Sequence, residues 1–251
     1  WRSSPPTYSD DDPPIRSRFQ TLSILFLSVD TMSDAMKDFV RASTEEQIAD
    51  RREEIISACE EIYLAGGYDA VTFKAISEKT SFSRPSIYNY FDTKEEVMMD
   101  LLTRYFVGWL DGIKGGLSSG DVSRERFCRI ISEVSAEHEN MFLLFTDLKL
   151  IEDGSGISHI IAFKGHFREF IEYICGFMDA NFHASEQSRE GFLEGLMMLF
   201  YGSYPHTHLS DKQTAAMEAA GVPYAPTDLR TLFYRQLMLF TSSFRSMRRH
   251  P

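Results

Sequence analysis

Two short helical patterns lie so close together in the N-terminal half of the chain that they constrain the fold more than any other feature. Residues 71–80 form one pattern and residues 84–90 form the other, with only residues 81–83 between them. Apolar side chains at helical spacing would pack the two against each other and against a preceding helix: Phe73, Ile76, Phe82 and Ile87. The second short helix then presents its N-terminal side chains outward. This arrangement is the helix-turn-helix plan.

The outer side of the second short helix carries groups suited to the major groove of DNA. Pro85 is tolerated there because the amides of a first helical turn lack intrahelical partners. The side chains predicted to lie at this surface are Ser83, Arg84, Pro85, Ser86, Tyr88, Asn89 and Tyr90. Thr72, Lys74 and Lys94 lie at or near the starts of neighbouring helices, where hydroxyl, ammonium and helix-end amide groups can bind phosphates.

Helical patterns continue on both sides of this motif. Residues 43–46 have capping-box spacing and begin a helix that the pair Gly66-Gly67 ends. Thr93 caps a longer helix that runs toward the pair Gly115-Gly116. After a break at residues 117–120, helices are expected at residues 121–138, 140–152, 157–183, 186–204, 211–220 and 227–247, with Pro205 among the breaks. The sequence therefore predicts an all-α fold.

This pattern divides the chain into three parts. Residues 43–114 are predicted to be a three-helix helix-turn-helix DNA-binding domain, and residues 115–251 a larger helical domain. Residues 1–42 are predicted to be a disordered leader, because four prolines and three consecutive aspartates near its start leave no apolar periodicity. Met32 or Met36 is the natural first residue under this interpretation. A secretory signal around the apolar residues 22–29 is the alternative.

Four blocks in order make the stretch from about residue 52 to residue 102 resemble the DNA-binding domain of TetR-type transcriptional regulators. They lie at residues 55–63, 67–72, 83–91 and 93–96, within about a fifth of the chain. The sequence departs from the usual pattern in its turn, which has Thr80-Ser81-Phe82 in place of Ala-Gly-Val. Pro85 also replaces a Gly or Ala, and Ser86 replaces a Thr. These departures concern the base contacts rather than the plan of the motif.

The resemblance implies that residues 115–251 bind a small effector and form a homodimer, and that the effector changes the spacing of the two DNA-binding domains. The partner of such a homodimer is a palindromic operator in double-stranded DNA. We predict a ligand-responsive repressor that an apolar or amphipathic effector releases from its operator. A helical adaptor protein with a vestigial helix-turn-helix is the alternative. The phosphate-binding, dinucleotide-binding and zinc-protease motifs are absent, and we predict no catalytic residue and no enzymatic activity.

Aromatic and thioether side chains are unusually frequent, with 20 Phe, 11 Tyr and 11 Met. Part of this apolar surface can line an effector cavity. The residues predicted to bind the effector are Tyr105, Trp109, Met141, Phe142, Phe145, Phe163, His166, Phe167 and Met197. His166 would serve as a polar anchor, and ordinary core packing is the alternative for each of these residues. No set of histidines has metal-ligand spacing, so neither a metal nor a cofactor is predicted.

Two C-terminal helical stretches carry apolar stripes at helical spacing, which are typical of a dimer interface or of a helical core. The stripes consist of Phe192, Leu196, Leu199, Phe200, Leu229, Leu232, Phe233, Gln236, Leu237 and Phe240. Two such pairs of helices would form a four-helix interface with the two-fold symmetry of a palindrome. Packing of the same stripes within one chain remains the alternative.

The formal net charge of −11 argues against a protein that coats DNA regardless of sequence. The stretch from Thr72 to Lys94 nevertheless carries four cations and two anions. We therefore expect weak non-specific affinity, with binding that depends on base contacts and dimerisation. Cys59, Cys128 and Cys175 lie far apart and indicate buried thiols in the reducing cytoplasm. No apolar run approaches the ~18–20 residues of a membrane span.

Overall fold

The N-terminal end of the described chain is a long helix, α2 (Ala35–Gly66), which ends where the sequence predicts. Gly67 has a φ of 73°, a left-handed conformation that glycine adopts without a Cβ clash. The computed structural model describes residues 35–118 and 123–247. The predicted leader up to residue 34 and part of the predicted break at residues 117–120 lie outside these ranges.

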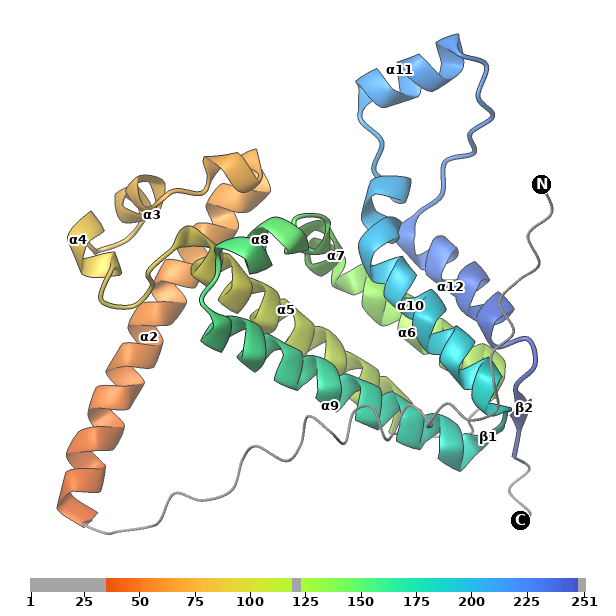
Figure 1. The fold of residues 1–251 in the computed structure, drawn as a ribbon, viewed down its shortest axis with the longest axis horizontal. Helices are drawn as coiled ribbons and strands as arrows, with labels where there is room; N and C mark the ends of the chain where they lie inside the picture. Colours follow the sequence, from red (N-terminus) through yellow and green to blue (C-terminus); the bar gives the residue numbers. More distant parts are fainter. Residues whose placement is uncertain (1–34, 119–122, 248–251) are drawn as a thin grey trace, which may run out of the picture. The chain divides into compact units, whose positions relative to one another are not determined.

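Short elements follow α2 and form the helix-turn-helix motif. They are η1 (Tyr68–Ala70), α3 (Phe73–Lys79) and α4 (Arg84–Ile87). The Thr72 hydroxyl accepts a hydrogen bond from the Ala75 amide and caps α3. We call residues 49–92 the head. Figure 1 shows the head at the N-terminal end of α5 (Lys94–Leu117), the helix that leads into the rest of the chain.

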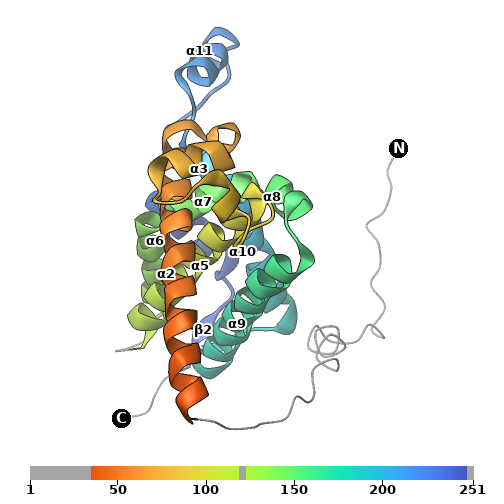
Figure 2. The ribbon, with the colours of Figure 1, turned by 90° about the vertical axis from the view of Figure 1, so that its left-hand side faces the viewer.

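The remaining helices form what we call the body, residues 123–247. Its elements are α6 (Arg124–Glu137), α7 (Glu139–Thr146), α8 (Leu148–Gly154), α9 (Ile157–Asn181), β1 (Phe182–His183), α10 (Glu186–Thr207), α11 (Asp211–Ala219), α12 (Leu229–Phe240) and β2 (Arg245–Ser246). Helix α5 packs against α6, α7, α8 and α9, while α10 and α12 close the opposite side (Figures 1 and 2). The two strands pair antiparallel over two residues. The described residues from Ala49 onward form one compact unit.

The all-α prediction is confirmed, but several boundaries differ from those predicted. Helix α2 begins at Ala35, so Ser43 lies inside it and does not cap it, and residues 35–42 are helical. The stretch predicted at 140–152 is two helices that meet at Asp147. Pro205 does not end α10 at once; it lies in the last turn, where its ring removes one amide hydrogen bond, and the helix continues only to Thr207. No helix among residues 35–118 and 123–247 has the length and apolar character that crossing a bilayer requires.

The last turns of α5 offer a test of this packing, because two adjacent glycines have different surroundings. A Cβ on Gly116 would lie 2.5 Å from Ile130 Cγ2, whereas a Cβ on Gly115 would meet nothing within 4 Å. We expect Gly116→Ala to lower the free energy of unfolding by roughly 1–3 kcal/mol, since β-branched Ile130 cannot easily move away. Gly115→Ala should raise it by up to about 1 kcal/mol through helix propensity. Urea unfolding measures both, and a Gly116→Ala variant as stable as Gly115→Ala would contradict the packing.

The cysteines provide a second test. Cys59 and Cys128 are buried and Cys175 is half-buried. Burial raises the pKa of Cys59 to about 12 and that of Cys128 to about 11, because the thiolate loses its hydration. At pH 8 almost no thiolate then exists at either position in the native chain. Alkylation by iodoacetamide, followed for each cysteine by mass spectrometry, should be slow at Cys59 and Cys128 until urea unfolds the chain. Equal rates in the native and unfolded chain would contradict the burial.

Candidate functional site

The helix-turn-helix motif is held together from within by apolar side chains. Phe73, Ile76, Phe82 and Ile87 are all buried. Phe82 lies in the turn between α3 and α4, with the Arg51 guanidinium 5.2 Å from its ring centroid. The Ser81 amide donates a 2.7 Å hydrogen bond to Glu54 Oε1 on α2. The turn is therefore fastened to the preceding helix, and α4 has a fixed position.

The outer side of α4 is exposed, as a groove-reading surface must be. Ser83, Arg84, Pro85 and Asn89 are exposed, and Ser86 and Tyr90 are half-buried. Tyr88 is 49% exposed, and its ring meets Phe73 edge-to-face at 4.9 Å between centroids. The Ser83 hydroxyl does not cap the helix and lies 2.8 Å from the Ser86 hydroxyl instead. We call residues 83–90 the recognition segment.

The recognition segment is only partly α-helical, because α4 ends at Ile87 and not at Tyr90. The amides of Asn89 and Tyr90 bond to carbonyls three residues earlier, those of Ser86 and Ile87. Such bonds are of the tighter 3₁₀ type and continue the turn without extending the α-helix. The side chains predicted for the DNA-binding surface therefore lie on one continuous run of helical turns.

The cations of the motif differ in whether a partner already engages them. Lys79 pairs with Glu61 at 2.8 Å, and exposed Lys74 lies 3.8 Å from Glu78. Lys94 is half-buried, donates to the Tyr68 carbonyl at 3.0 Å and lies 3.9 Å from the centroid of the Tyr68 ring. Within the described ranges, no ion pair or hydrogen bond engages the exposed side chain of Arg84. Among these cations, Arg84 is thus the most available to DNA. The ammonium group of Lys94 is instead directed toward Tyr68 in η1.

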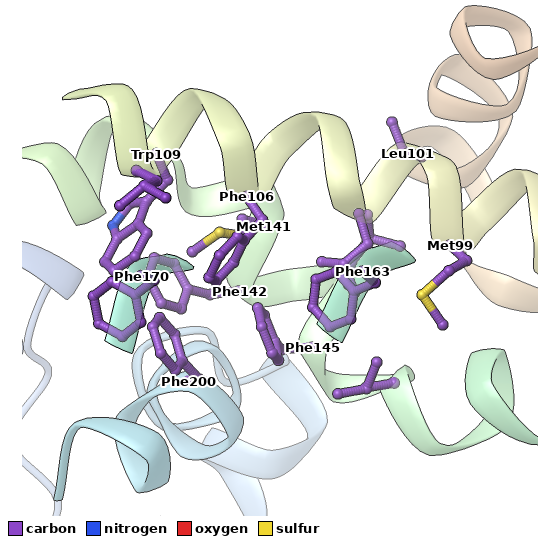
Figure 3. Packing of buried hydrophobic residues seen from close by; sticks show 14 of the residues in the cluster. Met99, Leu101, Phe106, Trp109, Met141, Phe142, Phe145, Phe163, Phe170 and Phe200 are labelled. Atoms are coloured by element: carbon purple, nitrogen blue, oxygen red, sulfur yellow. The ribbon is translucent and has the colours of Figure 1, made fainter. Parts of the chain in front are cut away.

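The predicted effector residues divide into a buried group and a peripheral group. Trp109, Met141, Phe142, Phe145 and Phe163 are buried and pack with Phe106, Phe170 and Phe200 (Figure 3). We call these eight residues the aromatic cluster. The shortest ring-centroid distances in this cluster are 5.0 Å for Trp109–Phe170 and 5.1 Å for Phe145–Phe200. The Trp109 indole N–H donates to Ser135 Oγ at 3.1 Å. The structure therefore brings this group together as packed core.

The peripheral group lies around or outside the aromatic cluster. Phe167 and Met197 are half-buried against the core. The Tyr105 hydroxyl donates to Glu60 on α2. His166 is half-buried, and its Nδ1 lies 3.7 Å from Glu169 on its own helix. Their assignment to an effector site stays a prediction.

Two hollows in the body involve none of the predicted effector residues. One, of about 660 Å³, lies beside β1, β2 and the start of α10 and is lined chiefly by polar side chains, among them His183, Ser185, Arg189 and Arg245. The other, of about 390 Å³, lies between α7 and α12 and includes Glu139, His208 and Asp228. His208 pairs with Glu139 at 2.9 Å. In the part of the chain that the structure describes, no three His, Cys, Asp or Glu side chains are arranged to hold a metal ion.

The apolar stripes of α10 and α12 face inward. Phe192, Leu196, Phe200, Phe233 and Leu237 are fully buried within one chain, so most of the residues predicted for a dimer face are intrachain core. Other apolar side chains of these helices point outward: Met198, Tyr201, Tyr234 and Leu239. The prediction from apolar stripes did not include these four residues, because it selected only the apolar positions on the helix face that packs into the core.

The sequence also contains a pattern that is typical of catalytic serines in some hydrolases. Residues 116–120 fit G-x-S-x-G, a pattern found around catalytic serines on a strand-to-helix turn. Ser118 instead follows α5 as its C-cap, and its hydroxyl donates to the Gly115 carbonyl at 2.7 Å. The position lacks the strand-to-helix setting that gives the pattern its chemical meaning.

Comparisons with known proteins agree with this architecture. Residues 55–101 match the family described as bacterial regulatory proteins, tetR family, and residues 103–242 match the tetracyclin repressor-like C-terminal domain. The HTH-type transcriptional activator FasR from Mycolicibacterium smegmatis is 26% identical over 77 residues, 31% of this chain. The chain spans about a third (35%) of that relative's length.

A solved structure with a TM-score above 0.5 shows the same fold. The fatty acid degradation regulator FadR from Bacillus halodurans matches 78% of this chain and 97% of its own, with 14% identity and a TM-score of 0.51. A putative TetR-family regulator from Mesorhizobium loti matches 78% and 98%, with 14% identity and a TM-score of 0.48. The two family matches together cover most of the head, nearly all of α5 and nearly the whole body, and on that basis the chain belongs to the TetR family of bacterial transcriptional regulators.

Proposed function

We propose that this chain is a homodimeric, ligand-responsive regulator that reads a palindromic operator with one recognition segment per half-site. The observation that carries the proposal is the exposed side chain of Arg84, without a partner among the described residues, at the start of α4 in a packed helix-turn-helix. An arginine in this position can bind the O6 and N7 atoms of a guanine with both arms of its guanidinium. Tyr88 and Asn89 are exposed beside it for further contacts.

The charges of the motif favour sequence-specific contacts to bases over non-specific contacts to the phosphate backbone. Several carboxylates surround the motif, and Glu61 and Glu78 already neutralise two of its lysines. Few phosphate contacts remain, which implies a shallow dependence of affinity on salt. Sequence specificity must then come from contacts to the bases and from the binding of the second protomer to the other half-site. The proposal takes repression as the direction of control, with the operator blocked until an apolar or amphipathic effector binds in the body. A reporter gene tests this direction, since activation by the unliganded chain would contradict it.

Arg84→Ala provides the direct test of base reading. We expect it to weaken binding to the duplex that the wild-type chain selects from a random pool by about 1–3 kcal/mol, the typical value of a bidentate base contact. Fluorescence anisotropy at fixed salt measures the affinity. Lys79→Ala is the matched control, because it removes the same charge from the same motif at a side chain that Glu61 already engages. Equal effects of the two variants would contradict base reading by Arg84.

Dimerisation is tested at the outward side chains of α10. Met198 is 66% exposed, and Tyr201 lies three residues later on the same face. We expect Met198→Glu to yield monomers in analytical ultracentrifugation at micromolar concentration and to abolish operator binding, since a buried unpaired carboxylate would oppose association. Ile161→Glu on α9 is the control, because Ile161 is also apolar and 57% exposed but lies on another helix. A Met198→Glu variant that stays dimeric would exclude this face as the interface.

A further inference from the structure

Two carboxylates on α5 connect the end of the recognition segment to the body. The first is Glu96, which is only 6% exposed. Its Oε2 accepts a 2.7 Å hydrogen bond from the Asp92 amide, directly after the recognition segment. Its Oε1 accepts from the Gly156 amide at 3.2 Å, in the turn between α8 and α9. One buried side chain therefore holds backbone from both halves of the chain.

The second carboxylate, Asp100, lies one helical turn further along α5. His159 Nδ1, on α9, lies 2.8 Å from Asp100 Oδ1. On the other side, Arg52 of α2 donates to Asp100 Oδ2 at 2.5 Å and to the Tyr90 carbonyl at 2.8 Å. The Arg52 guanidinium also lies 4.2 Å from the ring centroid of Phe91. A continuous chain of polar contacts thus runs from α9 to the last residue of the recognition segment.

His159 is the body residue that meets both connections. Its Nε2 lies 3.8 Å from Glu96 Oε2, and its ring lies 6.2 Å from that of Phe91. The turn between α8 and α9 packs closely against α5. A Cβ on Gly156 would lie 2.8 Å from Glu96 Oε1, and one on Gly154 would lie 2.5 Å from Glu95 Cγ. Thr93 Oγ1 adds a 2.9 Å hydrogen bond to the Gly154 carbonyl. A shift of the α8–α9 turn must therefore displace groups on α5 or break these bonds.

We propose that His159 is the positioning residue through which α9 sets the position of the recognition segment, with Asp100 and Glu96 as its two connections. This inference rests on the proposed function and names the route of its regulation. Helix α9 also contributes Phe163 and Phe170 to the aromatic cluster. An effector that displaces these rings moves α9, and His159 transmits the movement to Tyr90 and Asp92. Loss of the His159 contacts then changes operator affinity, although His159 is no part of the DNA surface.

His159→Ala tests the proposal by fluorescence anisotropy on the duplex that the wild-type chain selects from a random pool. We expect the affinity to fall at least about fivefold, the lower end of typical coupling between sites. Arg168→Ala is the control, because Arg168 is an exposed residue of the same helix whose partner, Glu172, lies on that helix. It should stay within about twofold of wild type, because an exposed pair contributes little. His159→Asn, whose amide can occupy the place of Nδ1, should restore most of the affinity.

Hydrogen–deuterium exchange of the full chain supplies a readout that does not depend on DNA. Exchange in a peptide that contains Asp92 should accelerate in His159→Ala and not in Arg168→Ala, while a peptide from α7 should stay unchanged. If His159→Ala does not fold, Arg52→Lys cuts the same chain of contacts at its other end and should show the same two effects. Wild-type affinity together with wild-type exchange at Asp92 would overturn the proposal. Failure of the wild-type chain to select any duplex would defeat the proposed function, while the exchange measurement would still decide whether the connection exists.

Discussion

Helix α5 is bound on one side by the head and on the other by the body, and the positions of both depend on it. Toward the head, Arg104 pairs with Glu53 and Glu60 on α2, and Arg52 of α2 pairs with Asp100. Toward the body, its buried side chains from Val97 to Leu117 pack into the core that α6, α7, α8 and α9 complete. Polar contacts thus join α5 to both the head and the body, and burial of apolar surface adds to its attachment to the body. A rigid helix with these two attachments can carry a displacement from one to the other.

The head could be predicted closely because local signals decide it. Thr72 and Thr93 cap their helices through amides three residues away, and Gly67 ends α2 through its own backbone conformation. The exposed surface of α4 follows from the spacing of a few apolar residues. Lys94 shows where such signals stop, because its ammonium is engaged by Tyr68, which lies 26 residues earlier in the sequence. No local pattern predicts that contact.

The body was predicted less well, and composition explains why. A phenylalanine that lines a cavity and one that fills a core have the same sequence signature, so Phe142 and Phe145 could be assigned to either. Helix register then decides details that spacing alone leaves open. It points His166 toward Glu169 and places the outward apolar residues of α10 and α12 between the buried ones. The connection through His159 and Asp100 joins residues 59 positions apart and depends wholly on the tertiary fold.

The symmetry of the DNA that the chain prefers tests the central claim most directly. Sequencing of duplexes that the wild-type protein enriches from a random pool, at two salt concentrations, shows both the bases read and their arrangement. A homodimer with one recognition segment per half-site predicts an inverted repeat whose half-site centres lie about one helical turn apart. It also predicts that this repeat persists at the higher salt, since base contacts outweigh phosphate contacts. Enrichment of no sequence, or of a single unrepeated site, would contradict the account.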